Sequence, residues 1–274
     1  MKLKMLSLLA FTALGTSMLT ACNETTEKDT TTNTTAGDQA AITITPVGNS
    51  PEFNGATLTV EEIKSELKGS DSVTITLNYG VQNYELKSQT ADAAGKGCNN
   101  SKDGQHIHFI LDNQPYTALY EPTHTFTIPV NSTHYVMSFL SRSYHESLKN
   151  KEAGVLLHFS VDEKGKLTKL ANPSGPMIFY SRPKGDYLGE DTRKVLLDFY
   201  VYGTQLAPDG HKVKAVINGT DFVIDQWQPY FIEQAPMGEM SVELVLQDSN
   251  GNVVQGDHTQ VSRKVQLAES EPMK

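Results

Sequence analysis

Five of the eight histidines fall between residues 106 and 145, and they offer the clearest chemistry in the sequence. His106 and His108 stand at positions i and i+2, which project to one side of a β-strand about 6.6 Å apart. Imidazole nitrogens are common ligands of zinc and copper, but such a site needs a third ligand from elsewhere in the chain. We therefore predict a copper or zinc site at His106 and His108, completed by His134 or His145.

Two alternatives to this metal site remain open at the level of sequence. The third ligand is also available from another residue type, namely Cys98, Asp112 or Glu146. A bare His-x-His pair is equally compatible with separate, exposed histidines that make ordinary hydrogen bonds, because the motif is weak until a third ligand is shown.

A second hypothesis concerns the segment Ser141–Lys149, which reads SRSYHESLK. Arg142, Tyr144 and Lys149 form a candidate anion- or peptide-binding set, since arginine suits bidentate recognition of phosphate or carboxylate. The alternative is a solvated loop that follows a strand. The metal and anion hypotheses differ in pH dependence, because a metal competes with protons for histidine whereas protonated histidine favours an anion.

The elements that must position these residues look like short β-strands. From Ile42 onward, runs rich in Val, Ile, Thr, Tyr and Phe alternate with turn sequences such as Asn-Gly and Asp-Gly. Many short strands at regular spacing indicate an all-β sandwich fold. Only residues 61–67 and 143–152 have a pattern that would also suit a helix.

A faint internal repeat predicts two tandem Ig-like β-sandwich domains, at residues 42–172 and 173–268. The matching segments occur in the same order in both halves, and the Pro- and Gly-containing stretch 171–176 separates them. The pairs are 73–86 with 195–206, 107–113 with 213–219, 120–122 with 227–229, and 136–140 with 242–246.

The repeat also predicts which way the histidines face. Lys212 and Lys214 occupy the positions of His106 and His108 in the second copy. Lysine rarely faces a protein core without a partner. We therefore expect the histidines to lie on the outer or rim face of their sheet.

The N-terminus predicts a lipoprotein. Residues 1–21 have a positive start, a short apolar run and small residues at the end, as in a signal peptide. The sequence Leu19-Thr20-Ala21-Cys22 resembles the bacterial lipobox, which implies cleavage before Cys22 and its lipidation with acyl chains such as palmitate. Residues 22–41 are Thr-rich and lack a hydrophobic core pattern, so we expect a disordered tether from an outer-membrane anchor.

Charge and cysteine content narrow the function further. Loss of Lys2 and Lys4 with the signal peptide leaves 21 basic against 32 acidic residues, a net charge of −11. A nucleic-acid partner is not expected, since phosphate binding needs a basic surface. With Cys22 lipidated, Cys98 is the remaining cysteine, so we expect no internal disulfide.

The segments 104–116 and 139–147 resemble an uncharacterised group of Bacteroidetes lipoproteins that are sometimes labelled phosphopeptide-binding proteins. The fragment Gly104 to His108 is also similar to the Gly-x-His-x-His strand of copper-zinc superoxide dismutases, which implies a metalloenzyme. However, the later histidines do not match that family's spacing, and the family's internal disulfide is not expected here.

These patterns together favour a non-enzymatic, membrane-anchored binding lipoprotein. Its expected ligand is a transition metal, or a peptide or glycan at the same histidine face. The alternatives are a copper/zinc enzyme of the superoxide dismutase type and a structural or adhesive surface spacer. No esterase, phosphate-loop or zinc-protease motif occurs in the sequence.

Overall fold

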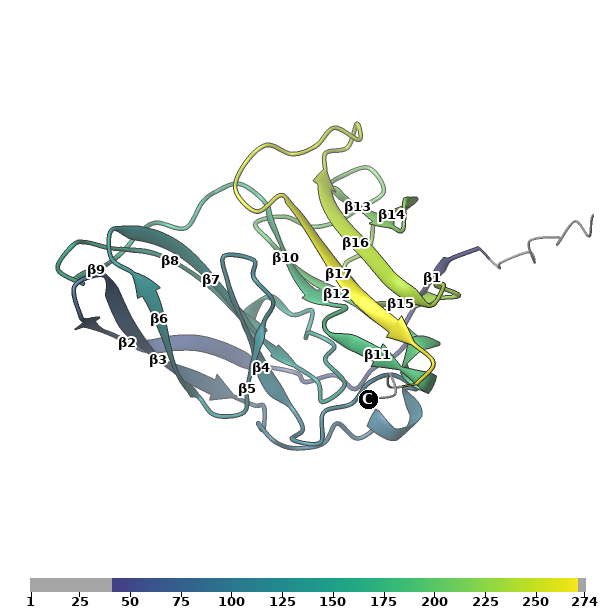
Figure 1. The fold of residues 1–274 in the computed structure, drawn as a ribbon, viewed down its shortest axis with the longest axis horizontal. Coiled ribbons are helices and arrows are strands. Elements are labelled where there is room, and N and C mark those ends of the chain that lie inside the picture. The colour runs from purple at the N-terminus through teal and green to yellow at the C-terminus, as the bar shows by residue number, and fades with distance from the viewer. Residues whose placement is uncertain (1–40, 271–274) are drawn as a thin grey trace, which may run out of the picture. The chain divides into compact units, whose positions relative to one another are not determined.

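The computed structural model describes residues 41–270, which fold as an all-β protein (Figure 1). These residues contain 17 β-strands and no α-helix. Three short 3-10 helices are present at η1 (Ala93–Gly95), η2 (Lys151–Ala153) and η3 (Gly189–Thr192). None of the described helices is long and apolar enough to cross a membrane. The all-β prediction is confirmed, whereas the signal peptide and Cys22 lie outside the described residues, as does the tether up to residue 40.

The first β-sandwich is built from the strands between residues 57 and 169. One sheet has the order β2-β3-β6 and the other the order β5-β4-β7-β8-β9. Buried and half-buried residues alternate along β3, because alternate side chains of a strand point to opposite faces. The bounds are β2 (Thr57–Lys68), β3 (Ser72–Gln82), β4 (His106–Leu111), β5 (Thr117–Leu119), β6 (Thr123–Pro129), β7 (Ser132–Ser141), β8 (Gly154–Val161) and β9 (Leu167–Lys169).

The second β-sandwich is built from strands after residue 176, together with β1. Its sheets have the orders β1-β15-β12-β10 and β11-β17-β16-β13-β14. The bounds are β1 (Thr43–Pro46), β10 (Met177–Arg182), β11 (Asp186–Leu188), β12 (Val195–Tyr202), β13 (Lys212–Ile217), β14 (Thr220–Ile224), β15 (Tyr230–Glu233), β16 (Gly238–Gln247) and β17 (Gln260–Ala268).

The two sandwiches share one strand order. The order β2-β3-β6 corresponds to β10-β12-β15, and β5-β4-β7-β8 corresponds to β14-β13-β16-β17. This division into a three-strand and a four-strand sheet is that of an Ig-like sandwich. Three of the four matched pairs fall on equivalent strands, and the fourth, 120–122 with 227–229, directly precedes the equivalent strands β6 and β15. The internal repeat therefore corresponds to a repeat of topology. The limits 42–172 and 173–268 as separately folding domains stay a prediction.

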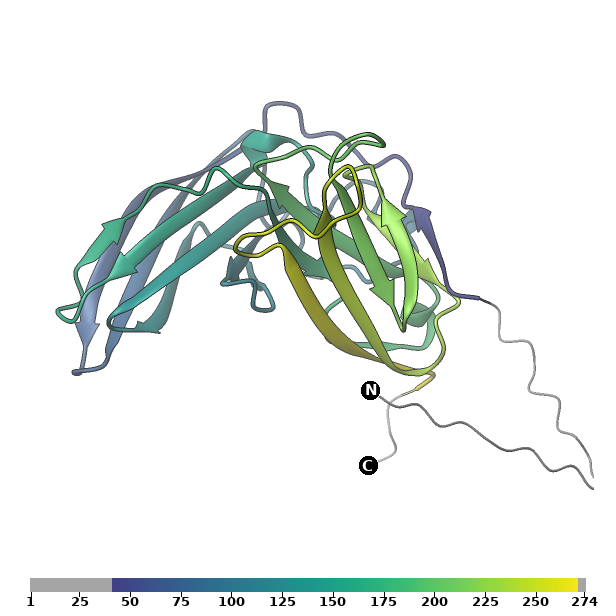
Figure 2. The same ribbon diagram turned by 90° about the horizontal axis from the view of Figure 1, so that it is seen from above.

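Strand β1 belongs to the second sandwich, whereas the sequence analysis placed its residues in the first. The range 42–172 assigns Thr43–Pro46 to the first sandwich, but β1 pairs antiparallel with β15, with Ile44 opposite Ile232. In Figures 1 and 2 the purple β1 lies among the green strands of the second sandwich. The four residues TITP alternate between polar and apolar, which indicates a strand but not the strand with which it pairs. The sequence therefore could not reveal this pairing.

Both helical alternatives are wrong. Residues 61–67 belong to the long strand β2, whose pairing with β3 outweighs the local preference of Glu and Lys for helix. Residues 143–152 form a folded loop with only η2 at its end. Local helix propensity is a weak guide in both segments because tertiary contacts decide their structure.

The hydrophobic core has three parts. Two clusters fill the interiors of the two sandwiches. A third combines residues from both, including Met137 and Phe139 of β7 with Phe179 of β10 and Tyr200 of β12. The rings of Phe139 and Tyr200 stack with centroids 5.0 Å apart. Strand β7 therefore buries one face in its own sandwich and the other against the second, beside the histidines of β4.

Candidate metal centre

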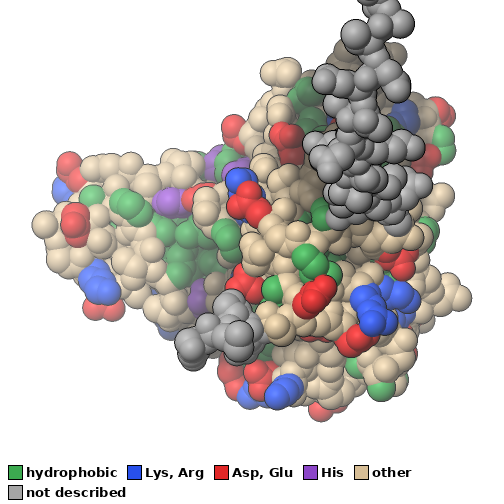
Figure 3. All heavy atoms as spheres, turned by 45° about the vertical axis from the view of Figure 1, so that its right-hand side comes forward, with side chains coloured by type: hydrophobic (Ala, Val, Ile, Leu, Met, Phe, Trp, Pro, Cys, Tyr) green, Lys and Arg blue, Asp and Glu red, His purple; other side chains and the backbone are tan. Residues whose placement is uncertain are grey.

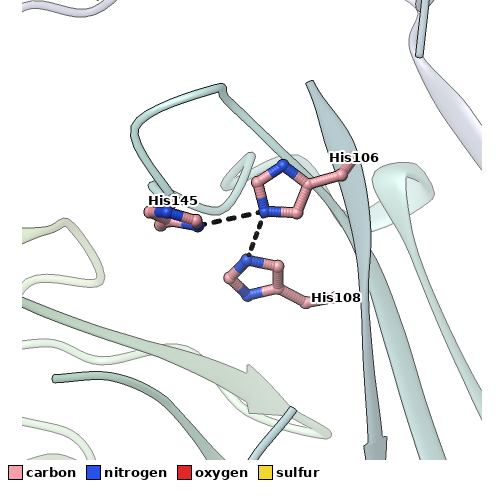
Figure 4. A group of neighbouring side chains, drawn as sticks. All are labelled: His106, His108 and His145. Carbon is pink, nitrogen blue, oxygen red and sulfur yellow. Dashed lines mark hydrogen bonds between the residues drawn. The ribbon is translucent and has the colours of Figure 1, made fainter. Parts of the chain in front are cut away.

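Three of the predicted site residues meet in one place. His106 and His108 lie on β4, which pairs with β7 so that His106 stands opposite Ser141. The chain then turns back immediately after β7, and the loop 142–148 brings His145 to the two strand histidines. Figure 4 shows His145 reaching from this loop toward the rings on the strand. The structure therefore selects His145, rather than His134, as the third member of the group.

The backbone of the loop is held firmly around His145. The Arg142 N–H donates to the Glu146 carbonyl over 2.8 Å, and the His145 N–H donates to the Arg142 carbonyl over 2.9 Å. His145 itself has φ of 68°, in the left-handed region that most side chains avoid. Such a conformation is costly for a residue other than glycine and is concentrated at functional sites. Histidine, with Asn and Asp, is among the non-glycine residues most often found in this region, and His258 adopts it as well.

The ring nitrogens of the three histidines lie at near-ligand spacing. His106 Nε2 is 2.9 Å from His108 Nε2 and 3.1 Å from His145 Nδ1. All three atoms lie within 4.8 Å of one another. A metal ion about 2.0–2.1 Å from each nitrogen separates neighbouring ligand atoms by roughly 2.8 Å in square-planar and 3.4 Å in tetrahedral geometry. The two distances from His106 Nε2 are thus close to the spacing of neighbouring ligands around one ion.

Hydrogen bonds on the far side of the rings orient them. His106 Nδ1 donates to the Gly104 carbonyl over 2.8 Å, so its Nε2 carries a free lone pair that faces the other rings. His108 Nδ1 lies 3.0 Å from the Ser181 hydroxyl. Donation from Nδ1 to this hydroxyl would free His108 Nε2 as well. Partners of this kind fix the tautomer and orientation of metal-binding histidines.

Burial keeps all three rings neutral. The relative exposure of His106 and His108 is 0%, and that of His145 is 7%. Burial lowers the pKa of His106 to about 4 and lowers the pKa of His108 and of His145 below the ordinary value. At neutral pH each ring is therefore neutral and keeps one nitrogen with a free lone pair, which is the form that binds a metal ion.

The prediction that the histidines face outward is wrong. Lys212 and Lys214 are indeed half-buried at the equivalent positions of β13. On β4, however, segments outside the strand cover the face: the loop 142–148, Tyr116 and Ser181. The Tyr116 ring stacks on His108 with centroids 3.6 Å apart and planes at 9°. The histidine rings consequently offer no open surface for a peptide or glycan.

Positive charge surrounds the triad. Among residues 41–270, the group of potential ligands contains no carboxylate or thiolate. Lys184 Nζ lies 4.2 Å and Arg182 Cζ 5.4 Å from the centroid of Tyr116, whose hydroxyl is 3.2 Å from His145 Nδ1. After burial, these cations are a further cause of the low pKa of His145. On the face shown in Figure 3 acidic and basic side chains are instead interspersed.

The other predicted metal ligands lie apart from the triad. His134 Nδ1 is 2.6 Å from the Asp112 carboxylate, and its Nε2 is 2.8 Å from Ser132 Oγ. Cys98 is a half-buried free thiol, and burial raises its pKa to about 11. Glu146 is buried and bonded to Arg142 and to the Ser50 hydroxyl. None of these residues belongs to the histidine group.

The residues of the predicted anion site have partners within the chain. Arg142 donates to the Glu146 carboxylate over 2.7 Å and to the Pro51 carbonyl over 2.6 Å. The Tyr144 hydroxyl donates to Asp92 over 3.1 Å. Lys149 lies 2.7 Å from the buried Asp198 carboxylate. Because carboxylates already neutralise both cations, these residues hold the loop in place rather than present positive charge.

Three residues that support the triad were not identified from the sequence: Gly104, Tyr116 and Ser181. Gly104 had a usable signal, since it opens the Gly-x-His-x-His fragment two residues before His106. In the structure Gly104 adopts φ of 83°. A Cβ there would approach the Lys87 carbonyl oxygen to 2.3 Å, so only glycine fits. Ser181 is 73 positions from His108 in the chain and carries no local signal.

No protein-family model matches the chain, and no curated protein matches it. Among solved structures it is similar to fibronectin(III)-like modules of CbhA from Clostridium thermocellum, at 11% identity and a TM-score of 0.28 over 35% of this chain and 100% of that one. It is also similar to the extracellular domain of a hybrid two-component system from B. thetaiotaomicron, at 11% identity and a TM-score of 0.26 over 80% of this chain and 39% of that one. The likeness to a biofilm-associated protein has a TM-score of 0.21, at 9% identity over 78% and 30% of the two chains.

Proposed function

We propose that this protein is a non-enzymatic binding module that holds one copper ion through His106, His108 and His145. The observation that carries the proposal is the convergence of three buried, neutral ring nitrogens, with His106 Nε2 at 2.9 and 3.1 Å from the other two. Three imidazoles, of which His106 and His108 have a partner for the second ring nitrogen, are a ligand set that suits copper and zinc.

Copper fits the surroundings of the triad better than zinc does. Cu²⁺ binds a given nitrogen site more tightly than Zn²⁺ in the usual order of affinities. In addition, Arg182 and Lys184 contact Tyr116 and place positive charge beside the triad. Repulsion scales with the charge of the ion, so monovalent Cu⁺ meets half the repulsion that a divalent ion meets.

We further propose that the module works outside the cytoplasm on a lipid anchor at Cys22, in the outer membrane. Support comes from the lipobox-like sequence Leu19–Cys22. A firm anchor needs more than one acyl chain, which a lipidated cysteine provides. The proposal is a binding rather than a catalytic role because the described ligand set is buried on every side, with at most 7% exposure for any of the three rings.

The test is a titration of the metal-free protein with Cu⁺ under reducing conditions, and with Cu²⁺ and Zn²⁺, in competition with chelators of known affinity. The informative variant is His145→Asn, because asparagine tolerates the left-handed backbone at this position but lacks the ring nitrogen. His134→Asn is the matched control, since it removes a histidine outside the triad.

We expect one copper ion per chain and tighter binding of copper than of zinc. Loss of one ligand should weaken binding by roughly 100-fold or more, since loss of an outer-shell partner alone costs about 10- to 100-fold. His134→Asn should leave the affinity unchanged. An unchanged affinity in folded His145→Asn, or no stoichiometric binding at all, would refute the metal site and leave the spacer alternative.

A further inference from the structure

A second site is indicated by polar groups that the protein buries without satisfying them. Among the described residues, the buried side-chain atoms with no hydrogen-bond partner are Tyr180 Oη, Arg182 Nε and Arg263 Nε. Buried polar atoms are almost always bonded, and the exceptions call for an explanation such as a ligand. All three belong to the second sandwich, on β10 and β17.

Two of these residues line one small cavity of about 60 Å³. Its wall comes from the end of β10, the turn that follows it, β17 and the loop after β4, and consists of Pro115, Tyr180, Ser181, Pro183, Lys184, Gly185, Arg263, Lys264 and Val265. Tyr180, Ser181 and Val265 are buried, whereas Pro115 and Gly185 are exposed. The cavity therefore has a buried floor and a rim at the surface. Its volume exceeds the roughly 10–15 Å³ that a single water needs.

The wall of the cavity is positively charged. From the part of the chain that the structure describes, no aspartate or glutamate lines it. Lys264 is neutralised by Glu239 at 2.7 Å. Within the described part of the chain, by contrast, neither Arg263 nor Lys184 forms a salt bridge, and both are bonded to carbonyl oxygens, Arg263 to that of Asn113 and Lys184 to that of Tyr116 over 2.7 Å.

Tyr180 adds a donor beside these charges. Its side chain is 2% exposed, and the Arg263 guanidinium carbon lies 5.6 Å from the centre of its ring. A phenolic hydroxyl and a guanidinium N–H are both donors, and a hydrogen bond from either to a charged oxygen is stronger than one to a neutral acceptor.

We propose that this cavity binds a small oxyanion group, with the Tyr180 hydroxyl and Arg263 Nε as donors and the Lys184 ammonium as a counter-charge. The chemical class is a carboxylate or a tetrahedral oxyanion such as sulfate. The site is separate from the copper ligands and does not depend on them, although its wall residue Ser181 also contacts His108 over 3.0 Å.

The test is a calorimetric titration of the metal-free protein with sodium sulfate and, separately, sodium acetate at constant ionic strength. Tyr180→Phe is the central variant, because the hydroxyl it removes has no partner within the described residues. Its loss should not lower stability in anion-free buffer but should weaken anion binding about tenfold or more, as expected for a hydrogen bond to a charged group. Arg263→Gln should weaken binding in the same direction.

Arg193→Gln is the control, since Arg193 is exposed and paired with Glu190 at 2.9 Å, outside the cavity. Saturable binding of sulfate, of acetate or of both, reduced in Tyr180→Phe and unchanged in the control, would support the proposal and show which oxyanion geometry fits. The proposal is overturned if neither anion binds saturably, or if Tyr180→Phe binds as the unmodified protein does.

Discussion

The loop that carries His145 is held by a buried ion pair whose removal should have a large and asymmetric effect. Asp198 of β12 is fully buried and accepts hydrogen bonds from Lys149 Nζ at 2.7 Å and from the Ser147 hydroxyl at 3.0 Å. Lys149 Nζ also donates to the Phe199 carbonyl over 2.9 Å. We predict that Lys149→Met destabilises the protein more than Asp198→Asn does.

The reason is the different burial of the two charges. Lys149→Met leaves the Asp198 carboxylate without a counter-charge where its side chain has 0% exposure, and breaking a buried pair in this way costs about 3–5 kcal/mol. Asp198→Asn leaves the ammonium group instead, and the Lys149 side chain is 18% exposed, so part of its charge can be hydrated. The double variant removes both charges and should be more stable than Lys149→Met alone.

The assay is urea unfolding of the metal-free protein and the three variants as a double-mutant cycle, with copper affinity measured on each folded variant. Lys149→Met should also weaken copper binding, because the loop 142–148 places His145. A cost below about 1 kcal/mol for Lys149→Met, or a double variant as unstable as the sum of the single ones, would show that the pair is not a buried, coupled ion pair.

Three further perturbations test the surroundings of the triad and the interior of the first sandwich. Gly104→Ala should lower the free energy of unfolding in urea by several kcal/mol more than Gly219→Ala does. Both glycines have φ of 83°, but only a Cβ at Gly104 meets a carbonyl oxygen, at 2.3 Å. Gly219→Ala should cost about 1–2 kcal/mol from its backbone conformation alone. Because the pKa of His106 is lowered to about 4 from 6.5, the unfolded chain binds more protons between these values. The stability of the metal-free protein should thus be complete above pH 6.5 and fall by about 3 kcal/mol from this residue as the pH drops to 4; a flat profile would contradict neutral burial. Tyr79→Phe should cost about 1–3 kcal/mol, because it leaves the buried Ser138 hydroxyl without its 2.7 Å partner, and Ser138→Ala in the same background should recover part of the loss.

The sequence was sufficient to locate most strands and to pair two of the three histidines of the buried group. Period-two alternation identifies strands such as β3 directly, and the repeat anticipated the shared strand order. It could not identify β15 as the partner of β1, since pairing over nearly 190 positions leaves no local signal. His145 and His134 were equally eligible as third ligands because their positions depend on how the chain turns after Ser141.

The wrong orientation of the histidine face has a physical cause with consequences for function. The equivalent strands β4 and β13 carry histidines and lysines, respectively, at the same positions. These side chains differ in burial because other segments of the chain cover β4. Over β4, Ser181 of the second sandwich bonds to His108, and the third hydrophobic cluster joins the same two sandwiches beside it. A ligand that binds the triad must therefore fit a space whose walls come from both sandwiches. Its binding energy is then linked to the packing between them, because anything that binds only the packed state stabilises that state.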